Sequence, residues 1–329
     1  MDYIELGKTG LKVSPIGLGT WQFGSKAWGW GKTYGREEAL SSVKKALDLG
    51  INFIDTAEIY GNGESERIVG EAIKGRRNEA IIATKVSPLH LSYNSVIRAC
   101  ERSLERLNIK EIDLYQIHFP NPIIPIKETM KAMNKLLRDG KIRYVGVSNF
   151  KLKQLKKAMG ALSNSHIVSN QVRYNLLNRE VERELLPFAK KEKITIIAYS
   201  PLAQGILTGK YGIKDYPKDG ARSMNRLFTP ENLKRVSPLL EVLKEIAEKR
   251  GKSMAQVALN WLIKEPEVLA IAGAKNPKQV EENAGALGWR ISEKELKAIE
   301  EAYKEIKLEN FRSYFRIFLR TILNLRALT

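Results

Sequence analysis

Three short apolar segments in the first 120 residues end at, or just before, a side chain that can carry or transfer a proton. Asp55 ends the first segment, Lys85 the second and His118 the third, and Tyr60 follows the first by five residues. Apolar runs of this length, separated by helical patterns, are typical of buried parallel strands, whose carboxyl ends meet on one face. The sequence therefore predicts that a carboxylate, a phenol, an ammonium and an imidazole share one pocket.

This combination suits proton transfer to a carbonyl oxygen. A phenol of pKa ~10 is too weak an acid at neutral pH unless a nearby cation stabilises the phenolate. We expect Tyr60 to be the general acid, Lys85 the cation, Asp55 the group that keeps Lys85 charged, and His118 the group that orients the substrate oxygen. Taken singly, each has a plainer explanation: a helix cap, a loop phenol, a solvated strand end or a core histidine. Their places at the ends of consecutive strands favour catalysis.

The elements that must position these residues alternate along the chain. Apolar segments predict eight strands, at residues 16–20, 52–55, 80–85, 113–118, 144–148, 167–171, 195–200 and 268–272. Helical patterns follow them, at residues 37–49, 65–74, 92–107, 125–138, 152–158, 179–190, 253–263 and 277–286. Eight strand and helix units predict an α/β fold of the closed (β/α)8 TIM-barrel type, because open doubly wound sheets usually have fewer strands.

Three further segments exceed this minimal plan. An N-terminal β-hairpin is predicted at residues 3–13 and should cover the bottom of the barrel. Two extra helices are predicted, one over residues 229–250 and one from Ser292 to about Lys307, both with capping signals. The barrel should thus occupy residues 1–308 as one domain.

Composition narrows the class of protein. The chain has 329 residues, 43% hydrophobic and 28% charged, as in ordinary soluble globular proteins. Its net charge of +18 would favour polyanions. However, Lys and Arg alternate with Glu along the helical patterns and no nucleic-acid motif stands out, so we expect a solvated surface that attracts anionic cofactors and no specific nucleic-acid partner.

The cysteine count and the N-terminus indicate where the protein works. The single cysteine, Cys100, excludes an intrachain disulfide and lies on an apolar helical stripe, so we expect a buried structural thiol. The N-terminus lacks the pattern of a signal peptide, which favours a cytoplasmic location. Rossmann, Walker, zinc-protease and serine-hydrolase motifs are absent from the sequence, and no metal is implied.

Five motifs in order resemble the aldo-keto reductase family: GLGTW at residues 17–21, FIDTAEIYG at 53–61, ATK at 83–85, QIH at 116–118 and GVSNF at 146–150. The resemblance implies an oxidoreductase that reduces aldehydes or ketones to alcohols, with hydride from NADPH and a proton from Tyr60. The small-molecule carbonyl substrate should then contact Trp21, Tyr60 and His118.

The resemblance also implies where the cofactor binds. Its contacts would be Gly19, Thr20, Trp21, Ser148, Asn149, Gln171, Tyr199, Ser200, Leu202, Gly205, Gly273, Lys275, Gln279, Glu282 and Asn283. Small residues after Tyr199 would let backbone N–H groups approach the pyrophosphate, and the helix that Asn276 caps would face a phosphate. Lys275 favours the 2′-phosphate of NADPH, while NADH stays an alternative because Gly273 stands where some branches of the family have Lys.

Other functions remain open at this stage. The main alternative is an NADPH-binding regulatory or interaction subunit with little turnover, and a third is polyanion binding through the basic surface. Residues 309–329 predict a basic amphipathic C-terminal tail with its arginines on one side, suited to contact with a protein partner, the barrel or, less favoured, an anionic membrane. The sequence does not identify the physiological substrate, the direction in the cell, or whether the protein is a monomer or a homo-oligomer.

Overall fold

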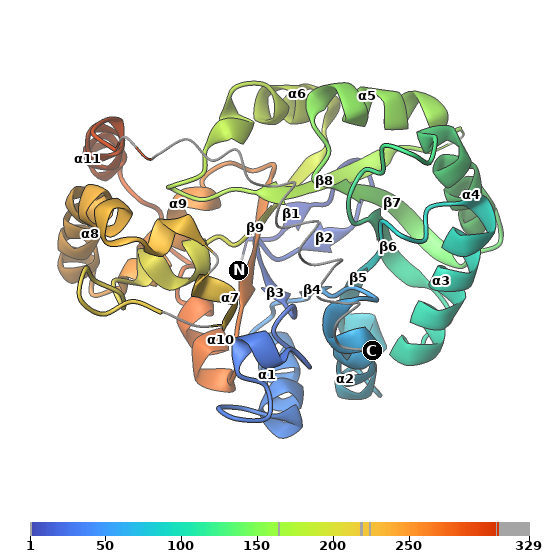
Figure 1. Cartoon of the computed structure of the whole chain (residues 1–329), viewed down its shortest axis with the longest axis horizontal. Helices are drawn as coiled ribbons and strands as arrows, with labels where there is room; N and C mark the ends of the chain where they lie inside the picture. Colours follow the sequence, from blue (N-terminus) through green and yellow to red (C-terminus); the bar gives the residue numbers. More distant parts are fainter. Residues whose placement is uncertain (1, 164, 218–219, 224, 307, 309–329) are drawn as a thin grey trace.

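A closed barrel of eight parallel strands forms the centre of the molecule (Figure 1). The computed structural model describes residues 2–163, 165–217, 220–223, 225–306 and 308, so the predicted tail at 309–329 lies outside the described residues and remains a prediction. The strands, in their order around the barrel, are β10 (Val268–Gly273), β3 (Ile16–Gly19), β4 (Phe53–Asp55), β5 (Ile81–Val86), β6 (Ile112–Ile117), β7 (Ile142–Ser148), β8 (Ile167–Arg173) and β9 (Thr195–Tyr199). The predicted (β/α)8 barrel is confirmed.

An outer layer of helices covers the barrel (Figure 1). These helices are α1 (Arg36–Asp48), α2 (Glu64–Ala72), α3 (Tyr93–Leu107), α4 (Ile126–Arg138), α5 (Leu152–Ala161), α6 (Leu185–Glu192), α9 (Met254–Leu262) and α10 (Pro277–Ala284). Each has an apolar stripe that faces the strands, as in α3, where Val96, Cys100 and Leu104 are buried. Cys100 is the buried free thiol that the sequence predicts, and burial raises its pKa to about 12.

The N-terminal hairpin closes the bottom of the barrel. β1 (Ile4–Glu5) and β2 (Lys12–Val13) pair antiparallel across the predicted turn. The Gly7 amide donates to Thr195 Oγ1 at 2.8 Å, and the Tyr144 hydroxyl donates to the Thr9 carbonyl at 3.1 Å. Leu6 and Val13 pack into the barrel interior, which strands β4 to β6 and β8 to β10 fill with apolar side chains. Because this end is plugged, the opposite end is the open one.

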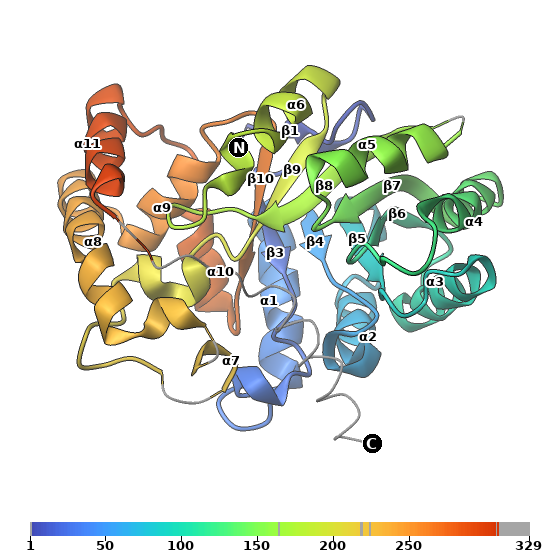
Figure 2. The same ribbon diagram turned by 45° about the horizontal axis from the view of Figure 1, so that its top comes forward.

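The two predicted extra helices are α8 (Pro230–Arg250) and α11 (Glu293–Lys304), which pack side by side at one edge of the molecule (Figures 1 and 2). The predicted helix at 179–190 differs from the structure, since α6 begins only at Leu185, after a short 3-10 turn at Glu180–Glu182. Pro187 explains the difference. It has no N–H group, so it fits the first turn of a helix but would break a helix that began at residue 179.

A short helix, α7 (Gly220–Ser223), was not predicted because it spans a single turn with no apolar period. It lies in the segment between β9 and α8, against the 3-10 turn Lys26–Trp28 after β3. Two loops that are distant in the sequence therefore meet near the open end of the barrel.

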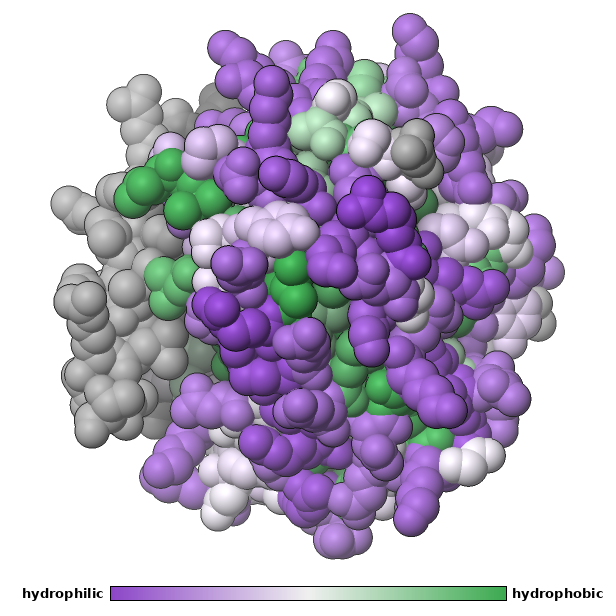
Figure 3. Space-filling view, turned by 90° about the vertical axis from the view of Figure 1, so that its right-hand side faces the viewer, coloured by the Kyte–Doolittle hydropathy of each residue, from purple (hydrophilic) through white to green (hydrophobic). Residues whose placement is uncertain are grey.

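The outer face of the helix layer is polar. The space-filling view of the side that carries α3 and α4 is mostly hydrophilic, with small and separate apolar areas (Figure 3). This agrees with the Lys-rich solvated helices that the sequence predicts. Over the described ranges, none of the helices is long and apolar enough to cross a membrane.

Candidate active site

A cavity of about 800 Å³ opens at the carboxyl ends of the strands. Strand register brings these ends level, because Gly19 pairs with Asp55, Asp55 with Ala83, and Lys85 with Gln116. All the residues predicted from the resemblance to contact the cofactor line this cavity, as do Asp55, Tyr60 and His118. Lys85 lies behind them and is completely buried.

Lys85 is the centre of the cluster that the sequence predicts to be catalytic. Its Nζ donates to Asp55 Oδ1 at 2.5 Å, to the Thr56 carbonyl at 2.8 Å and to the Tyr60 hydroxyl at 3.3 Å. The second carboxylate oxygen of Asp55 accepts from Gln171 Nε2 at 2.7 Å and from Gln116 Nε2 at 3.3 Å. A buried ion pair needs such additional hydrogen bonds to offset the loss of water.

A tight turn holds Tyr60 above Lys85. The 3-10 turn Tyr60–Gly63 contains three successive residues with left-handed backbone, Gly61 (φ 54°), Asn62 (φ 53°) and Gly63 (φ 84°). A Cβ atom at Gly61 would lie 2.7 Å from Gly24 Cα, so only glycine allows the turn to approach the loop after β3 this closely. Gly61, which follows Tyr60 in the motif, therefore helps to place the phenol.

The protonation states of the cluster follow from burial. Burial raises the pKa of the Tyr60 phenol well above its usual value, and the negative charge of Asp55 adds to this effect. Burial lowers the pKa of Lys85, whereas Asp55 opposes that shift. Burial is the largest of these effects on Tyr60, so the phenol keeps its proton. That Lys85 strengthens Tyr60 as an acid stays a prediction.

His118 faces Tyr60 across the floor of the cavity. Their rings lie 5.7 Å apart, edge to face, and His118 stacks on Phe119. Burial, together with the charge of Lys85, lowers the pKa of His118 well below its usual value, so the ring is neutral. Its Nδ1 atom is buried and has no hydrogen-bond partner within the described part of the chain.

Four of the predicted nicotinamide contacts form a connected network on the next strands. The Asn149 amide nitrogen donates to Ser148 Oγ at 3.0 Å and to the His118 carbonyl at 3.1 Å, and its oxygen accepts from the Tyr199 hydroxyl at 2.9 Å. Ser148 Oγ donates to the Gln171 carbonyl at 2.9 Å. These hydrogen bonds fix the orientation of the polar groups that line this end of the cavity.

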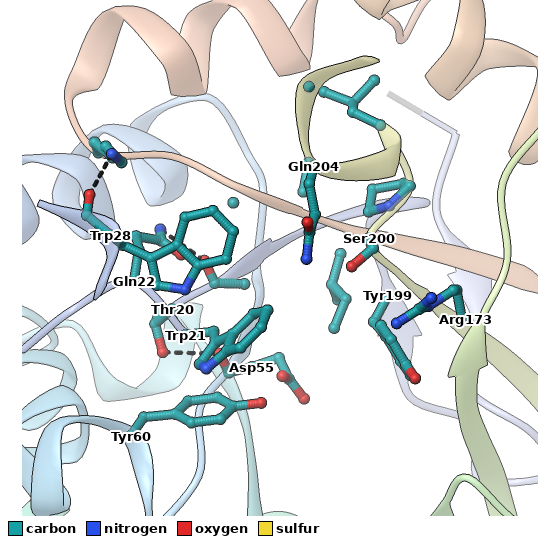
Figure 4. A pocket seen from close by; sticks show the side chains of 18 of the residues that line it. Thr20, Trp21, Gln22, Trp28, Asp55, Tyr60, Arg173, Tyr199, Ser200 and Gln204 are labelled. Carbon is teal, nitrogen blue, oxygen red and sulfur yellow. Dashed lines mark hydrogen bonds between the residues drawn. The ribbon is translucent and has the colours of Figure 1, made fainter. Parts of the chain in front are cut away.

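The cavity has two facing sides (Figure 4). Tyr60, Trp21 and Asp55 lie on one side, and Tyr199, Ser200 and Gln204 lie on the other. Trp21 remains 46% exposed at the mouth and contacts Trp28 edge to face at 5.0 Å. A flat group bound between the two sides would contact the Tyr199 ring.

The segment after β9 has an unusual backbone. Ser200, Ala203 and Gln204 all have positive φ angles, of 51°, 48° and 57°, and Gly205 has a φ of 105°. Non-glycine residues adopt this conformation rarely, and consecutive N–H groups in such turns form anion-binding concavities. Nearby, Asn276 Oδ1 accepts from the backbone N–H of Gln279 and caps α10. The N-terminus of this helix lines the same cavity.

Sequence reasoning missed two cations in this part of the cavity, Lys210 and Arg222. The Arg222 guanidinium lies 4.8 Å from the Trp28 ring and donates to the Gln204 carbonyl at 2.8 Å. Lys275 donates to the Trp28 carbonyl, and its pKa is lowered by burial and by the charges of Arg222 and Lys210. The basic residues between 207 and 229 were the available signal, although no period in the sequence indicates which of them reach the cavity.

Comparison with known proteins agrees with this geometry. Residues 15–304 match the model of the aldo/keto reductase family. The chain is 46% identical to an uncharacterized oxidoreductase of Mycobacterium tuberculosis over 93% of this chain and 94% of that protein. It is 38% identical to the aldo-keto reductase YhdN of Bacillus subtilis, over 91% of this chain and 92% of that protein.

The chain is also similar to a solved structure and to a relative with a different kind of name. The crystal structure of an aldo-keto reductase from Klebsiella pneumoniae in complex with NADPH is 31% identical, covers 95% of this chain and 98% of its own, and has a TM-score of 0.76. A probable voltage-gated potassium channel subunit beta of Arabidopsis thaliana is 34% identical, over 87% of this chain and 91% of that protein. This chain belongs to the aldo/keto reductase family and is an oxidoreductase.

Proposed function

We propose that this protein reduces aldehydes or ketones to alcohols with NADPH, and that Tyr60 donates the proton. One observation carries the proposal. The hydroxyl of Tyr60 lies 3.3 Å from an ammonium that Asp55 holds at 2.5 Å, and this arrangement sits in the floor of a cavity large enough for a dinucleotide.

The residues present fit this cofactor. The left-handed backbone at Ser200 and at residues 203–205 would receive the pyrophosphate, and the cations Lys210, Arg222 and Lys275 would bind phosphate groups. Burial lowers the pKa of Lys275, and the charges of Arg222 and Lys210 lower it further, so a phosphate would relieve part of this cost. Three cations favour NADPH over NADH, because only NADPH carries the additional 2′-phosphate.

The other end of the cavity would hold the nicotinamide. Tyr199 provides a flat ring against which it can stack, while Ser148, Asn149 and Gln171 provide polar groups for its carboxamide. NADPH, when bound, supplies a hydride to the carbonyl carbon of the substrate.

Side chains of the protein supply the proton that the reduction requires. Burial keeps Tyr60 protonated at neutral pH, so the phenol can donate to the developing alkoxide. Lys85, kept charged by Asp55, stabilises the phenolate that remains. His118 is neutral, and because its Nδ1 atom has no partner among the described residues, we assign its proton to Nε2, which can donate to the carbonyl oxygen.

A loss of NADPH absorbance with a panel of small aldehydes and ketones tests the proposal. We expect turnover with at least part of the panel and a lower KM for NADPH than for NADH. A lower KM for NADH would contradict the cofactor assignment.

A second candidate is an NADPH-binding subunit with little turnover. The similarity to a probable potassium channel subunit beta favours it, since that protein is named for an assembly and not for a reaction. Tight binding of NADPH, measured by fluorescence, together with no turnover across the whole panel would support this candidate and contradict the first.

A further inference from the structure

Glu58 is a buried carboxylate that the proposed reaction does not use. It lies two residues before Tyr60, in the loop after β4, and its side chain is only 6% exposed. A carboxylate is rarely buried unless hydrogen bonds or ion pairs compensate for lost water. Its contacts therefore indicate what this residue holds in place.

The carboxylate of Glu58 binds both ends of a turn that follows β5. Its Oε1 atom accepts from the backbone N–H of Ser87 at 2.6 Å and lies 3.0 Å from Nδ1 of His90. The backbone N–H of His90 donates to the Ser87 carbonyl at 2.9 Å and closes the turn. The other oxygen, Oε2, lies 3.6 Å from Arg102 Nη2 on α3, which supplies a countercharge.

The turn at residues 87–90 forms part of the cavity wall. Ser87, Pro88 and Leu89 line the cavity, and Leu89 is 59% exposed. A ligand with an apolar group would remove this leucine from water and would gain affinity in doing so.

A second contact joins this turn to the neighbouring loop between β6 and α4. Asn121 Nδ2 donates to the Pro88 carbonyl at 2.9 Å, while its Oδ1 accepts from the backbone N–H of Ile123 at 2.7 Å. Phe119, from the same loop, also lines the cavity. Pro88, Leu89 and Phe119 of the two linked loops thus form one apolar wall, and Glu58 holds this wall through Ser87 and His90.

We propose that Glu58 is a positioning residue that holds the 87–90 turn as the apolar wall of the substrate end, and that it thereby selects carbonyl compounds with an apolar group. This inference rests on the proposed function of the same site. It links the loop that carries the proton donor to the loop that contacts the substrate.

Four variants test the proposal: Glu58→Ala, Glu58→Gln, Leu89→Ala and the double variant of Glu58→Ala with Leu89→Ala. The readout is the ratio of KM for benzaldehyde to KM for propanal, with saturating NADPH. We expect the ratio to rise about tenfold in Glu58→Ala and in Leu89→Ala, because each loses the apolar contact. Glu58→Gln retains an acceptor for the Ser87 N–H, so its KM ratio should stay close to that of the wild type.

The double variant separates positioning from a general effect. If Glu58 acts through the wall, its removal should add little once Leu89 is truncated, since coupled residues are not additive. The proposal would be overturned if the double variant raised the KM ratio by the product of the two single effects. It would also be overturned if Glu58→Ala raised both KM values equally. Glu101→Ala removes an exposed carboxylate beside Arg102 and is the control, with an unchanged ratio expected.

Misfolding of Glu58→Ala and a lack of turnover in the wild type are the two outcomes that need a separate test. Should Glu58→Ala fail to fold, Glu58→Asp decides by the same ratio, because its carboxylate is one methylene shorter and loses the contact to the Ser87 N–H. A wild-type protein that binds NADPH but turns over no member of the panel of aldehydes and ketones contradicts the proposed function. A wild-type protein with turnover and an unchanged ratio in Glu58→Ala contradicts only the role of Glu58.

Discussion

The ammonium nitrogen of Lys85 lies 3.3 Å from the hydroxyl oxygen of Tyr60, and the Lys85 side chain is completely buried. Water screens the charge little at this depth, and Asp55, which lies 2.5 Å from the same nitrogen, balances part of it. The same burial keeps the phenol protonated before the reaction. In the proposed mechanism the phenol is the resting acid, and Lys85 stabilises the phenolate that it leaves.

Replacement of Tyr60 by Phe should remove the proton donor and leave the cavity shape intact. We expect kcat for aldehyde reduction to fall by about 10²-fold or more, as for loss of a general acid, with little change in NADPH affinity. Stopped-flow turnover and fluorescence titration measure the two quantities. Tyr3→Phe, at a surface tyrosine, is the control, and a Tyr60→Phe protein with near wild-type kcat would refute the mechanism.

Replacement of Asp55 by Asn should change the pH dependence of kcat. Burial already lowers the pKa of Lys85, and Asp55 opposes that effect. Without the carboxylate the pKa of Lys85 falls further. As the pH is raised, Lys85 should therefore lose its proton earlier than in the wild type, and the alkaline loss of activity should begin at a lower pH. A profile of kcat from neutral to alkaline pH tests this. An alkaline limb that moved upward or stayed in place would show that Asp55 does not act through Lys85.

Removal of a cation near α10 should weaken the binding of NADPH more than that of NADH. For Arg222→Ala and Lys275→Ala we expect the KM for NADPH to rise about tenfold, equivalent to about 1.4 kcal/mol. The effect should be smaller at high salt, because ions screen exposed charges. Lys294→Ala, on the exposed face of α11, serves as the control. Equal effects on both cofactors would indicate that these side chains do not contact the 2′-phosphate.

The contact between α8 and α11 should make stability depend on pH in acid. Arg250 donates to both oxygens of Glu295 at 2.7 Å, and these bonds lower the pKa of Glu295 from 4.5 to about 2. A carboxyl whose pKa is lowered on folding stabilises the protein above its unfolded pKa and loses that effect as the pH falls through the folded value.

Glu295→Gln should accordingly lower Tm at neutral pH, and the difference from the wild type should shrink as the pH falls from about 4.5 towards 2. Glutamine can still accept the Ser292 N–H bond that caps α11, so the difference reports on the ion pair. Thermal melts of both proteins across acidic pH provide the measurement, with Glu293→Gln as the matched control. A difference that persisted unchanged at the lowest pH would refute this account.

Much of this molecule follows from local patterns. The apolar segments and the helical periods between them predict the barrel, because each strand and helix must bury its own apolar face. Asp55, Lys85 and His118 could be identified as a group since each stands at the end of such a segment, and parallel strands bring their carboxyl ends together. The start of α6 was missed because Pro187 outweighs the apolar period.

Contacts between loops could not be predicted from these patterns. Arg222 reaches Trp28, and Glu58 reaches Ser87 and His90, only because the barrel brings loops after different strands to the same end. The sequence by itself determined the class of fold and which side chains at the ends of the strands meet at the open end of the barrel. Tertiary structure alone decided how deeply Lys85 and Tyr60 are buried, and therefore their pKa values, since burial depends on what every neighbouring element contributes.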